Sequence, residues 1–303
     1  MQGNLQSYMK VGLVHFMAFP ETLKGDGPIL ETLATVAEDP FFGSVEVTRI
    51  NDPKVRREAA VLLASAGLEV GFGAQPMILS TKSDLNSLDE AARQAALATC
   101  YEALAQAKEL GAKKLGILSG PDPGPEKREA AKEALIRSLV ELGRRCEDAG
   151  IQLALETFDF DIDKKALVGP NKEAAEIART IRRDVPSFGL MIDLSHLPLQ
   201  YETPQDALTA AADVLIHAHC GNAIMRDKSH PLYGDQHPRF GHPDGENGVP
   251  ELREYLRVLL EIGYLRQGEQ RTLAFEVKPA PGERSGAVIA GSKRALLEAW
   301  ATL

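Results

Sequence analysis

Short apolar runs rich in β-branched residues alternate along the whole chain with longer segments whose apolar residues recur every three or four positions. The short runs have the length of strands, and the longer segments have the period of amphipathic helices. The predicted strands cover residues 11–19, 44–50, 68–74, 114–120, 151–158, 188–195, 214–221 and 271–278. The clearest helices are predicted at 88–110, 128–149 and 249–263.

The order of these segments favours one closed barrel. Gly111, Gly150 and Gly263 follow the three predicted helices, where glycine commonly ends a helix. No Ser/Gly-rich linker and no change in composition divides the chain. Eight strand–helix pairs without a break predict a single (β/α)8 TIM barrel over residues 1–303, rather than two doubly wound domains.

The segment 221–248, after the seventh strand, interrupts the alternation. It is rich in Gly, Pro, His, Asp and Asn and has no helical or strand period. Loops of this length without structure of their own are uncommon and usually functional. We expect this segment to form a lid over the barrel.

Charge and cysteine content restrict the classes of protein. The 303 residues include 34 Lys and Arg against 43 Asp and Glu, a net charge of -9, and 44% of positions are hydrophobic. The composition indicates a folded protein, and the acidic balance argues against nucleic-acid or anionic-membrane partners. Three widely spaced cysteines, with no signal peptide or membrane-spanning run, predict a cytoplasmic location.

Strand alternation places acidic and histidine side chains at one end of the barrel. In the fifth strand the leucines face the helices, and Glu156 is the last residue that faces the axis. The same count puts Asp193, His219 and Glu276 at the matching level of the sixth, seventh and eighth strands. The carboxyl ends of the strands form the active site in TIM barrels, so these four residues are candidates for one site.

Three buried carboxylates at one level would repel one another unless a cation lies among them. Glu156, Asp193, Glu276 and His219 would offer three oxygen donors and one imidazole. This donor set suits Mn²⁺ best, with Mg²⁺, Co²⁺ or Zn²⁺ as alternatives. His217 faces the axis one layer deeper, and we expect it to orient its neighbours rather than bind the metal.

The motifs ALETF, IDLSH, HAHCGN and AFEVKP carry a family resemblance. Their series of Glu, Asp-x-x-His, His and Glu resembles the xylose-isomerase-like TIM barrels, a superfamily of sugar isomerases and epimerases that includes D-tagatose 3-epimerase. The resemblance covers essentially the whole chain. It implies that Glu156, Asp193, His219 and Glu276 bind the metal.

The resemblance also implies a chemistry. A proton would leave the carbon next to a sugar carbonyl to give an enediolate, with Glu156 and Glu276 moving the proton on opposite faces and His196 holding a substrate oxygen. Arg226 is a candidate for binding substrate, although a solvated loop arginine explains it equally well. We expect Asp235 and His237, in the 221–248 loop, to reach the pocket.

Three alternatives remain open at this stage. The long loop also fits a metal-dependent lyase that cleaves 3-keto glycosides, like the barrel subunit of C-glycoside deglycosidases. The Asp235-x-His237 pair resembles ligands for additional zinc ions in endonuclease IV, but the acidic charge argues against a nuclease. A non-catalytic sugar-binding barrel would not need the complete ligand set. Expected partners are a small carbohydrate and either further copies of this chain or a small partner subunit.

Overall fold

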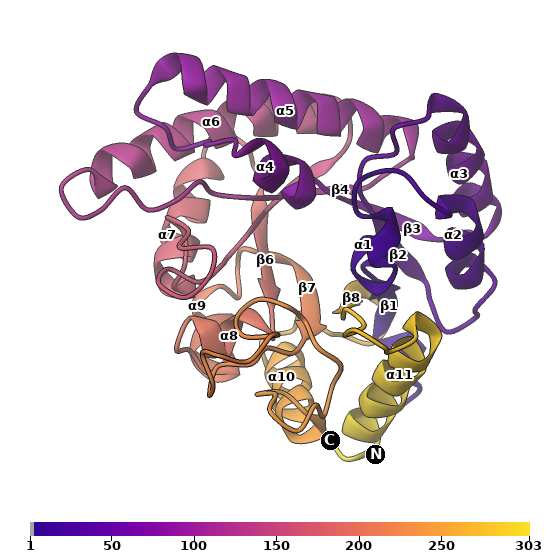
Figure 1. The fold of residues 1–303 in the computed structure, drawn as a ribbon. Helices are drawn as coiled ribbons and strands as arrows, with labels where there is room; N and C mark the ends of the chain where they lie inside the picture. Colours follow the sequence, from indigo (N-terminus) through magenta and orange to yellow (C-terminus); the bar gives the residue numbers. More distant parts are fainter. Residues whose placement is uncertain (1–2) are drawn as a thin grey trace.

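All eight predicted strands are present, run parallel and form the wall of a nearly closed barrel in the computed structural model (Figure 1), which describes residues 3–303. The predicted TIM-barrel fold is confirmed. The strands are β1 (Met9–Leu13), β2 (Ser44–Val47), β3 (Glu69–Gly73), β4 (Lys114–Leu118), β5 (Gln152–Glu156), β6 (Gly189–Asp193), β7 (Leu215–Gly221) and β8 (Arg271–Glu276).

Helices surround the strands on the outside (Figure 1). They are α1 (His15–Ala18), α2 (Ile29–Ala37), α3 (Pro53–Ser65), α4 (Gln75–Thr81), α5 (Glu90–Glu109), α6 (Arg128–Asp148), α7 (Asn171–Ile181), α8 (His196–Leu199), α9 (Pro204–Ala210), α10 (Val249–Glu261) and α11 (Ser285–Ala301). The three clearest predicted helices correspond to α5, α6 and α10. Within residues 3–303, none of these helices has the length and apolar character that a membrane crossing requires.

The sheet runs in the order β1-β8-β7-β6-β5-β4-β3-β2. A single parallel bridge between Val14 and Glu46 then brings the β1 and β2 ends of the sheet together. The predicted first strand, 11–19, was too long, because the chain turns into helix α1 at His15. The apolar run continues through that turn, since Val14 and Phe16 pack with Ala274 inside the barrel, so hydrophobicity does not mark where the strand ends.

Alternate strand residues face two different environments, as the sequence predicted. Leu153 and Leu155 belong to the large apolar core between the sheet and the helices. Gly116 pairs with Ala154, which alternates with these two leucines and so faces the barrel axis. Met191 faces inward as well, because its Cε would lie 3.1 Å from a Cβ added at Gly116. This alternation directs the last polar residue of each strand toward the barrel axis.

Glu69 links strands at the amino-terminal end of the barrel, opposite the predicted site. Its carboxylate lies 2.7 Å from Lys10 Nζ and 2.8 Å from Lys114 Nζ, which ties β3 to β1 and β4. Burial alone would raise the pKa of Glu69, but Lys114 and Lys10 lower it to about 2 from the usual 4.5. The folded protein therefore favours the charged carboxylate.

We predict that Glu69→Gln lowers the free energy of unfolding at pH 7 by about 1 kcal/mol, allowing for partial exposure of the ion pairs. The pKa of Glu69 is lower in the folded state than in the unfolded state. The charged carboxylate therefore stabilises the folded protein fully above pH 4.5, and this stabilisation is lost as the pH falls toward 2. Urea unfolding of both proteins at pH 7, 4 and 3 tests this. A difference that stays constant over this range would contradict it.

Candidate active site

The structure brings together the four residues predicted to bind a metal. Glu156, Asp193 and Glu276 end β5, β6 and β8, and His219 lies near the end of β7. One ligand atom from each of the four residues lies within 4.8 Å of all the others. All four side chains are buried, and Glu276, at 9%, is the most exposed. Side chains from four separate strands thus meet around one point.

Three side-chain atoms of these four residues make no hydrogen bond of proper geometry among the described residues. They are Glu156 Oε1, His219 Nδ1 and Glu276 Oε2. His219 Nδ1 lies 2.7 Å from Glu276 Oε2 and 3.5 Å from Glu156 Oε1. Buried polar atoms almost always have partners, so three unsatisfied atoms facing one another match the donor set of a divalent cation.

Neighbouring residues hold two of these carboxylates, those of Glu156 and Asp193. The Gln75 side-chain amide, at the start of α4, donates to Glu156 Oε2 over 2.7 Å. Asp193 accepts hydrogen bonds from the Ser195 backbone N–H, over 2.9 Å, and from the Ser195 hydroxyl. Burial raises the pKa of Asp193, as expected for a carboxylate among other carboxylates. The cluster is therefore fixed in position and still short of positive charge.

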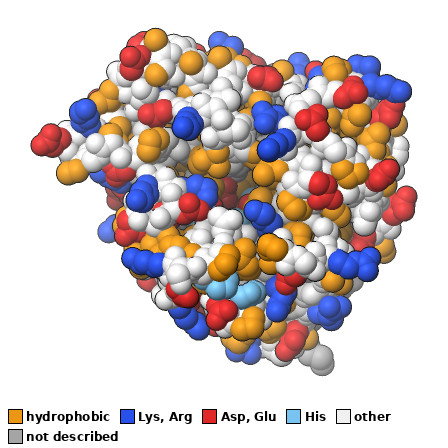
Figure 2. Space-filling view, viewed as in Figure 1, with side chains coloured by type: hydrophobic (Ala, Val, Ile, Leu, Met, Phe, Trp, Pro, Cys, Tyr) orange, Lys and Arg blue, Asp and Glu red, His pale blue; other side chains and the backbone are white. Residues whose placement is uncertain are grey.

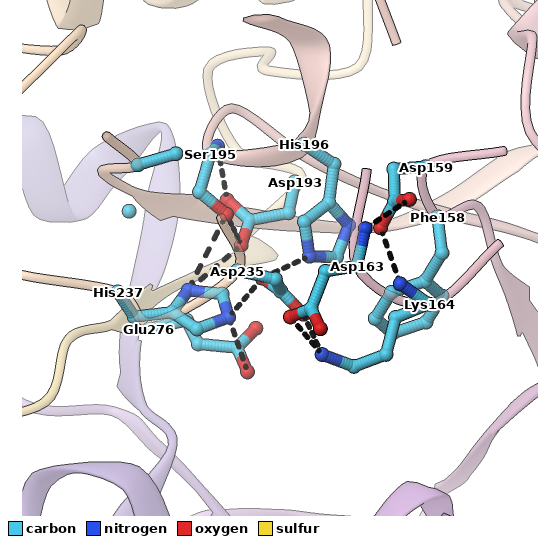
Figure 3. Close-up of polar contacts among 12 residues, drawn as sticks. Phe158, Asp159, Asp163, Lys164, Asp193, Ser195, His196, Asp235, His237 and Glu276 are labelled. Atoms are coloured by element: carbon cyan, nitrogen blue, oxygen red, sulfur yellow. Dashed lines mark hydrogen bonds and ion pairs between the residues drawn. The ribbon is translucent and has the colours of Figure 1, made fainter. Parts of the chain in front are cut away.

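Asp235 connects the long loop to the site (Figure 3). Its Oδ1 lies 3.1 Å from His196 Nε2 and 2.7 Å from His237 Nε2, and its Oδ2 lies 2.8 Å from Lys164 Nζ. The other ring nitrogen of His196, Nδ1, lies 2.8 Å from the carbonyl oxygen of Thr157. The structure thus places His196, Asp235 and His237 beside the four predicted metal ligands.

The charge of the site favours protonated histidines around Asp235. Burial alone would lower the pKa of His196, but Asp235 and Asp193 raise it to about 10. Burial likewise opposes charge on His237, and Glu276 and Asp235 raise its pKa to about 9. Both rings are therefore hydrogen-bond donors at neutral pH.

The backbone conformation of the long loop places the His237 side chain in the site. This residue has a φ of 51°, in the left-handed region that non-glycine residues rarely adopt. Its carbonyl oxygen accepts from the Lys278 backbone N–H over 2.7 Å, which pins the loop to the end of β8. At the base of the loop, the Asn222 side chain accepts from the Asn247 backbone N–H over 2.7 Å. Whether the loop opens as a lid stays a prediction.

Lys164 reaches the site from the segment between β5 and α7. The carboxylate of Asp159 accepts hydrogen bonds from the backbone N–H groups of residues 162, 163, 164 and 165, which winds this segment into a tight turn. Lys164 Nζ lies 2.8 Å from Asp235 and 3.0 Å from Asp163. Burial opposes its charge, but the two carboxylates raise the pKa of Lys164 above its usual value. Lys164 is therefore a permanent cation beside Asp235.

A cavity of about 410 Å³ opens above these residues. The polar part is lined by Glu46, Gln75, Ser80, Glu156, Lys164, His219, Asp235, His237 and Glu276. Its apolar part is lined by Phe16, Met17, Leu23, Pro76, Leu79 and Phe158. Lys24 and Arg49 also line the cavity. Figure 2 shows a hollow near the middle of this face, with hydrophobic side chains gathered around it. The cavity therefore has a charged floor and an apolar wall.

Arg226 is the one predicted site residue that the structure places apart. Its side chain is 67% exposed, lies 3.4 Å from Glu246 and does not line the cavity. Its role in substrate binding stays a prediction. Three residues at the site were missed from the sequence: Glu46, Gln75 and Lys164. Glu46 carried a usable signal, because it alternates with Val45 and Val47 and so faces the barrel axis.

Comparison with known proteins identifies the fold family. A model of the xylose isomerase-like TIM barrels matches residues 37–289. No functionally curated protein matches the chain in sequence.

Solved structures with this fold cover nearly the whole chain. A D-tagatose 3-epimerase-like protein is 18% identical with a TM-score of 0.72, and covers 97% of this chain and 99% of its own. The IOLI protein, solved with a bound zinc atom, is 17% identical with a TM-score of 0.74 and the same coverage. The 3-keto-D-glucoside 4-epimerase from E. coli is 16% identical, with a TM-score of 0.64 and coverage of 97% and 99%. At these identities the likeness shows the fold alone.

We predict that Mn²⁺ at about 100 times its dissociation constant raises the melting temperature of the chelator-treated protein by about 5 °C, because the ion binds only the folded state. Asp193→Asn should remove most of this shift, since it replaces a ligand and keeps its shape. Asp184→Asn, at an exposed ion pair with Arg144, should keep the full shift and serves as the control. Equal shifts in the two variants, measured by differential scanning calorimetry, would contradict the site.

Proposed function

The chain belongs to the xylose isomerase-like TIM barrel family, and from this premise we propose that it is a divalent-metal-dependent sugar isomerase or epimerase. The reaction would remove a proton next to a carbonyl and return one. The observation that carries this proposal is the cluster of Glu156, Asp193, His219 and Glu276, whose ligand atoms lie within 4.8 Å of one another at the floor of a cavity.

These four residues would hold the metal. Bound there, a divalent cation would polarise a substrate carbonyl and stabilise the charge that develops when the neighbouring proton leaves. Three carboxylates and one imidazole favour Mn²⁺, with Mg²⁺ or Co²⁺ as close alternatives. The zinc atom in the structure of the IOLI protein supports Zn²⁺ as a further candidate.

Glu156 and Glu276 are the groups that we assign to proton transfer. Glu276 is the more exposed of the two, at 9% against 2%, and its Oε1 lies 3.7 Å from His237 Nε2. The Gln75 amide already occupies one oxygen of Glu156. Glu276 Oε1 has no such hydrogen bond among the described residues, so we assign to it the acceptance of a proton from a substrate in the cavity. Glu156 would act from the other side of the sugar.

His237, Asp235 and Lys164 would hold the hydroxyl groups of the sugar, and direct contact between His196 and the substrate stays a prediction. His237, Asp235 and Lys164 line the cavity, while His196 supports Asp235 from behind over 3.1 Å. Together they offer donors and acceptors for a polyhydroxylated ligand. A small carbohydrate is therefore the substrate class that we propose.

We predict that Glu276→Gln and Glu156→Gln each reduce turnover of a ketose by at least 10³-fold, because each removes a proton-transfer group. The measurement is the incorporation of solvent deuterium at the carbon next to the carbonyl, followed by NMR. The bound metal per chain is measured alongside, to separate loss of the base from loss of the ion. Glu283→Gln, at a glutamate paired with Arg239 outside the cavity, is the matched control. Deuterium incorporation at the wild-type rate in either site variant would exclude that residue.

The apolar wall favours a second candidate, a lyase that cleaves 3-keto glycosides. A free sugar offers little apolar surface to match Phe16, Leu79 and Phe158, whereas an aromatic aglycone would bury that surface on binding. The neighbour named 3-keto-D-glucoside 4-epimerase supports keto glucosides as ligands for this fold. Proton abstraction beside the ketone is common to both reactions, and the lyase also expels the aglycone.

The site supports the remaining alternatives less well. Asp193, His196 and His237 form a further group whose ligand atoms lie within 4.8 Å of one another, which is only part of what a multinuclear nuclease cluster needs. The ends of β3 and β4 lead into Gln75 and Ser119, where a multinuclear nuclease cluster would need histidines. A non-catalytic barrel would not explain the complete ligand set of four residues. Self-association and a small partner subunit both stay predictions.

One assay separates the two candidate reactions. The Mn²⁺-loaded protein is incubated with a free ketohexose or with an aryl 3-keto glucoside, and the products are followed by NMR. We expect an epimer or aldose from the ketose. Release of the phenol from the glucoside, with no change in the ketose, would establish the lyase instead.

A further inference from the structure

A buried carboxylate lies directly beneath the predicted metal ligands. Glu46, from β2, is 3% exposed. Its Oε1 lies 2.7 Å from His217 Nε2 and 2.8 Å from His219 Nε2. One carboxylate oxygen therefore accepts hydrogen bonds from two imidazoles on β7, across the inside of the barrel.

These contacts determine which nitrogen of His219 is available. Since Nε2 carries the proton donated to Glu46, the lone pair of a neutral His219 lies on Nδ1. Nδ1 is the atom that faces Glu276 Oε2 at 2.7 Å and Glu156 Oε1 at 3.5 Å. It is buried and has no hydrogen-bond partner among the described residues. The orientation of the ring and the position of its proton both suit a metal ligand.

We propose that Glu46 is a positioning residue, which fixes His219 with Nδ1 toward the metal and increases the donor strength of its ring. The inference rests on the proposed metal site. Histidine ligands commonly donate their second ring N–H to a carboxylate, and loss of that partner weakens metal affinity by about 10- to 100-fold.

A glycine in the neighbouring strand leaves room for the Glu46 carboxylate. Gly71 is the register partner of Glu46 in the neighbouring strand β3. A Cβ added to Gly71 would lie 2.8 Å from Glu46 Cγ, closer than packed atoms allow. Glycine at this position therefore leaves the space that the Glu46 side chain occupies.

His217 restrains Glu46 from the same strand. The His217 and His219 rings meet edge to face with centroids 5.0 Å apart, and both donate to the one oxygen. Rotation of the Glu46 side chain would break two buried hydrogen bonds together, which holds the carboxylate beneath His219. In this proposal His217 would support the metal site through Glu46, which is the orienting role expected from the sequence.

The test is the affinity of chelator-treated protein for Mn²⁺, measured by isothermal titration calorimetry without substrate. We expect Glu46→Gln to bind Mn²⁺ about 10- to 100-fold more weakly than the wild type, because the neutral amide fixes His219 less strongly. The matched control is Glu69→Gln, which removes another carboxylate inside the barrel at its opposite end and should leave the affinity within twofold. The visible absorption bands of bound Co²⁺, which report the ligand field, should shift in Glu46→Gln alone.

A second variant covers the case in which Glu46→Gln does not fold. Gly71→Ala keeps the carboxylate but displaces it, and should weaken Mn²⁺ binding and shift the Co²⁺ bands in the same direction. Wild-type affinity and an unshifted Co²⁺ spectrum in the folded variants would overturn the role of Glu46 and leave the metal site intact. A wild-type protein that binds neither Mn²⁺ nor Co²⁺ would overturn the metal site, and this inference with it.

Discussion

Mutual repulsion among buried carboxylates is the constraint on which the rest of the site depends. Six of them lie at one end of the barrel with 9% exposure or less: Glu46, Glu156, Asp159, Asp193, Asp235 and Glu276. An isolated charge is expensive to bury, so this arrangement persists only where positive charge and hydrogen bonds compensate. Side chains of the protein supply part of this compensation. Lys164 forms an ion pair with Asp235, and the imidazoles of His217 and His219 donate to Glu46. The group formed by Glu156, Asp193, Glu276 and His219 keeps three atoms without a hydrogen bond among the described residues, and the proposed divalent cation would complete its balance.

The barrel supplies the geometry that makes this concentration of charge possible. Parallel strands end at one face, and alternation turns every second side chain toward the axis, so four strands place one ligand each without any loop having to be ordered. The loops contribute the remaining charged side chains of the site. The turn around Asp159 brings in Lys164, and the left-handed backbone at His237 directs its ring toward Asp235. Under the proposed function, the strands would hold the groups for the chemical step. The loops, together with α1 and α4 on the apolar side of the cavity, would govern the choice of substrate.

The sequence predicted those parts of the site that strand periodicity controls. Glu156 and Glu276 could be placed because a period of two fixes both the face and the level of a residue near the end of a strand. Glu46 has the same signal, but the strand predicted from the sequence ran to residue 50, so Glu46 did not stand at its last inward position. The observed strand ends at Val47. Lys164 could not be placed, since it lies in a segment whose path depends on four backbone hydrogen bonds to Asp159. The loop residue Arg226 shows the same limit, because no periodicity determines which side of a loop faces the cavity.

We propose that Glu156, Asp193, His219 and Glu276 form one metal site. Anomalous diffraction from a crystal of the chelator-treated protein soaked in Mn²⁺ is the most direct test. We expect one dominant anomalous peak, at about 2.0 to 2.5 Å from one oxygen of each carboxylate and from His219 Nδ1. Strong peaks elsewhere in the chain, with none among these four residues at saturating Mn²⁺, would contradict it.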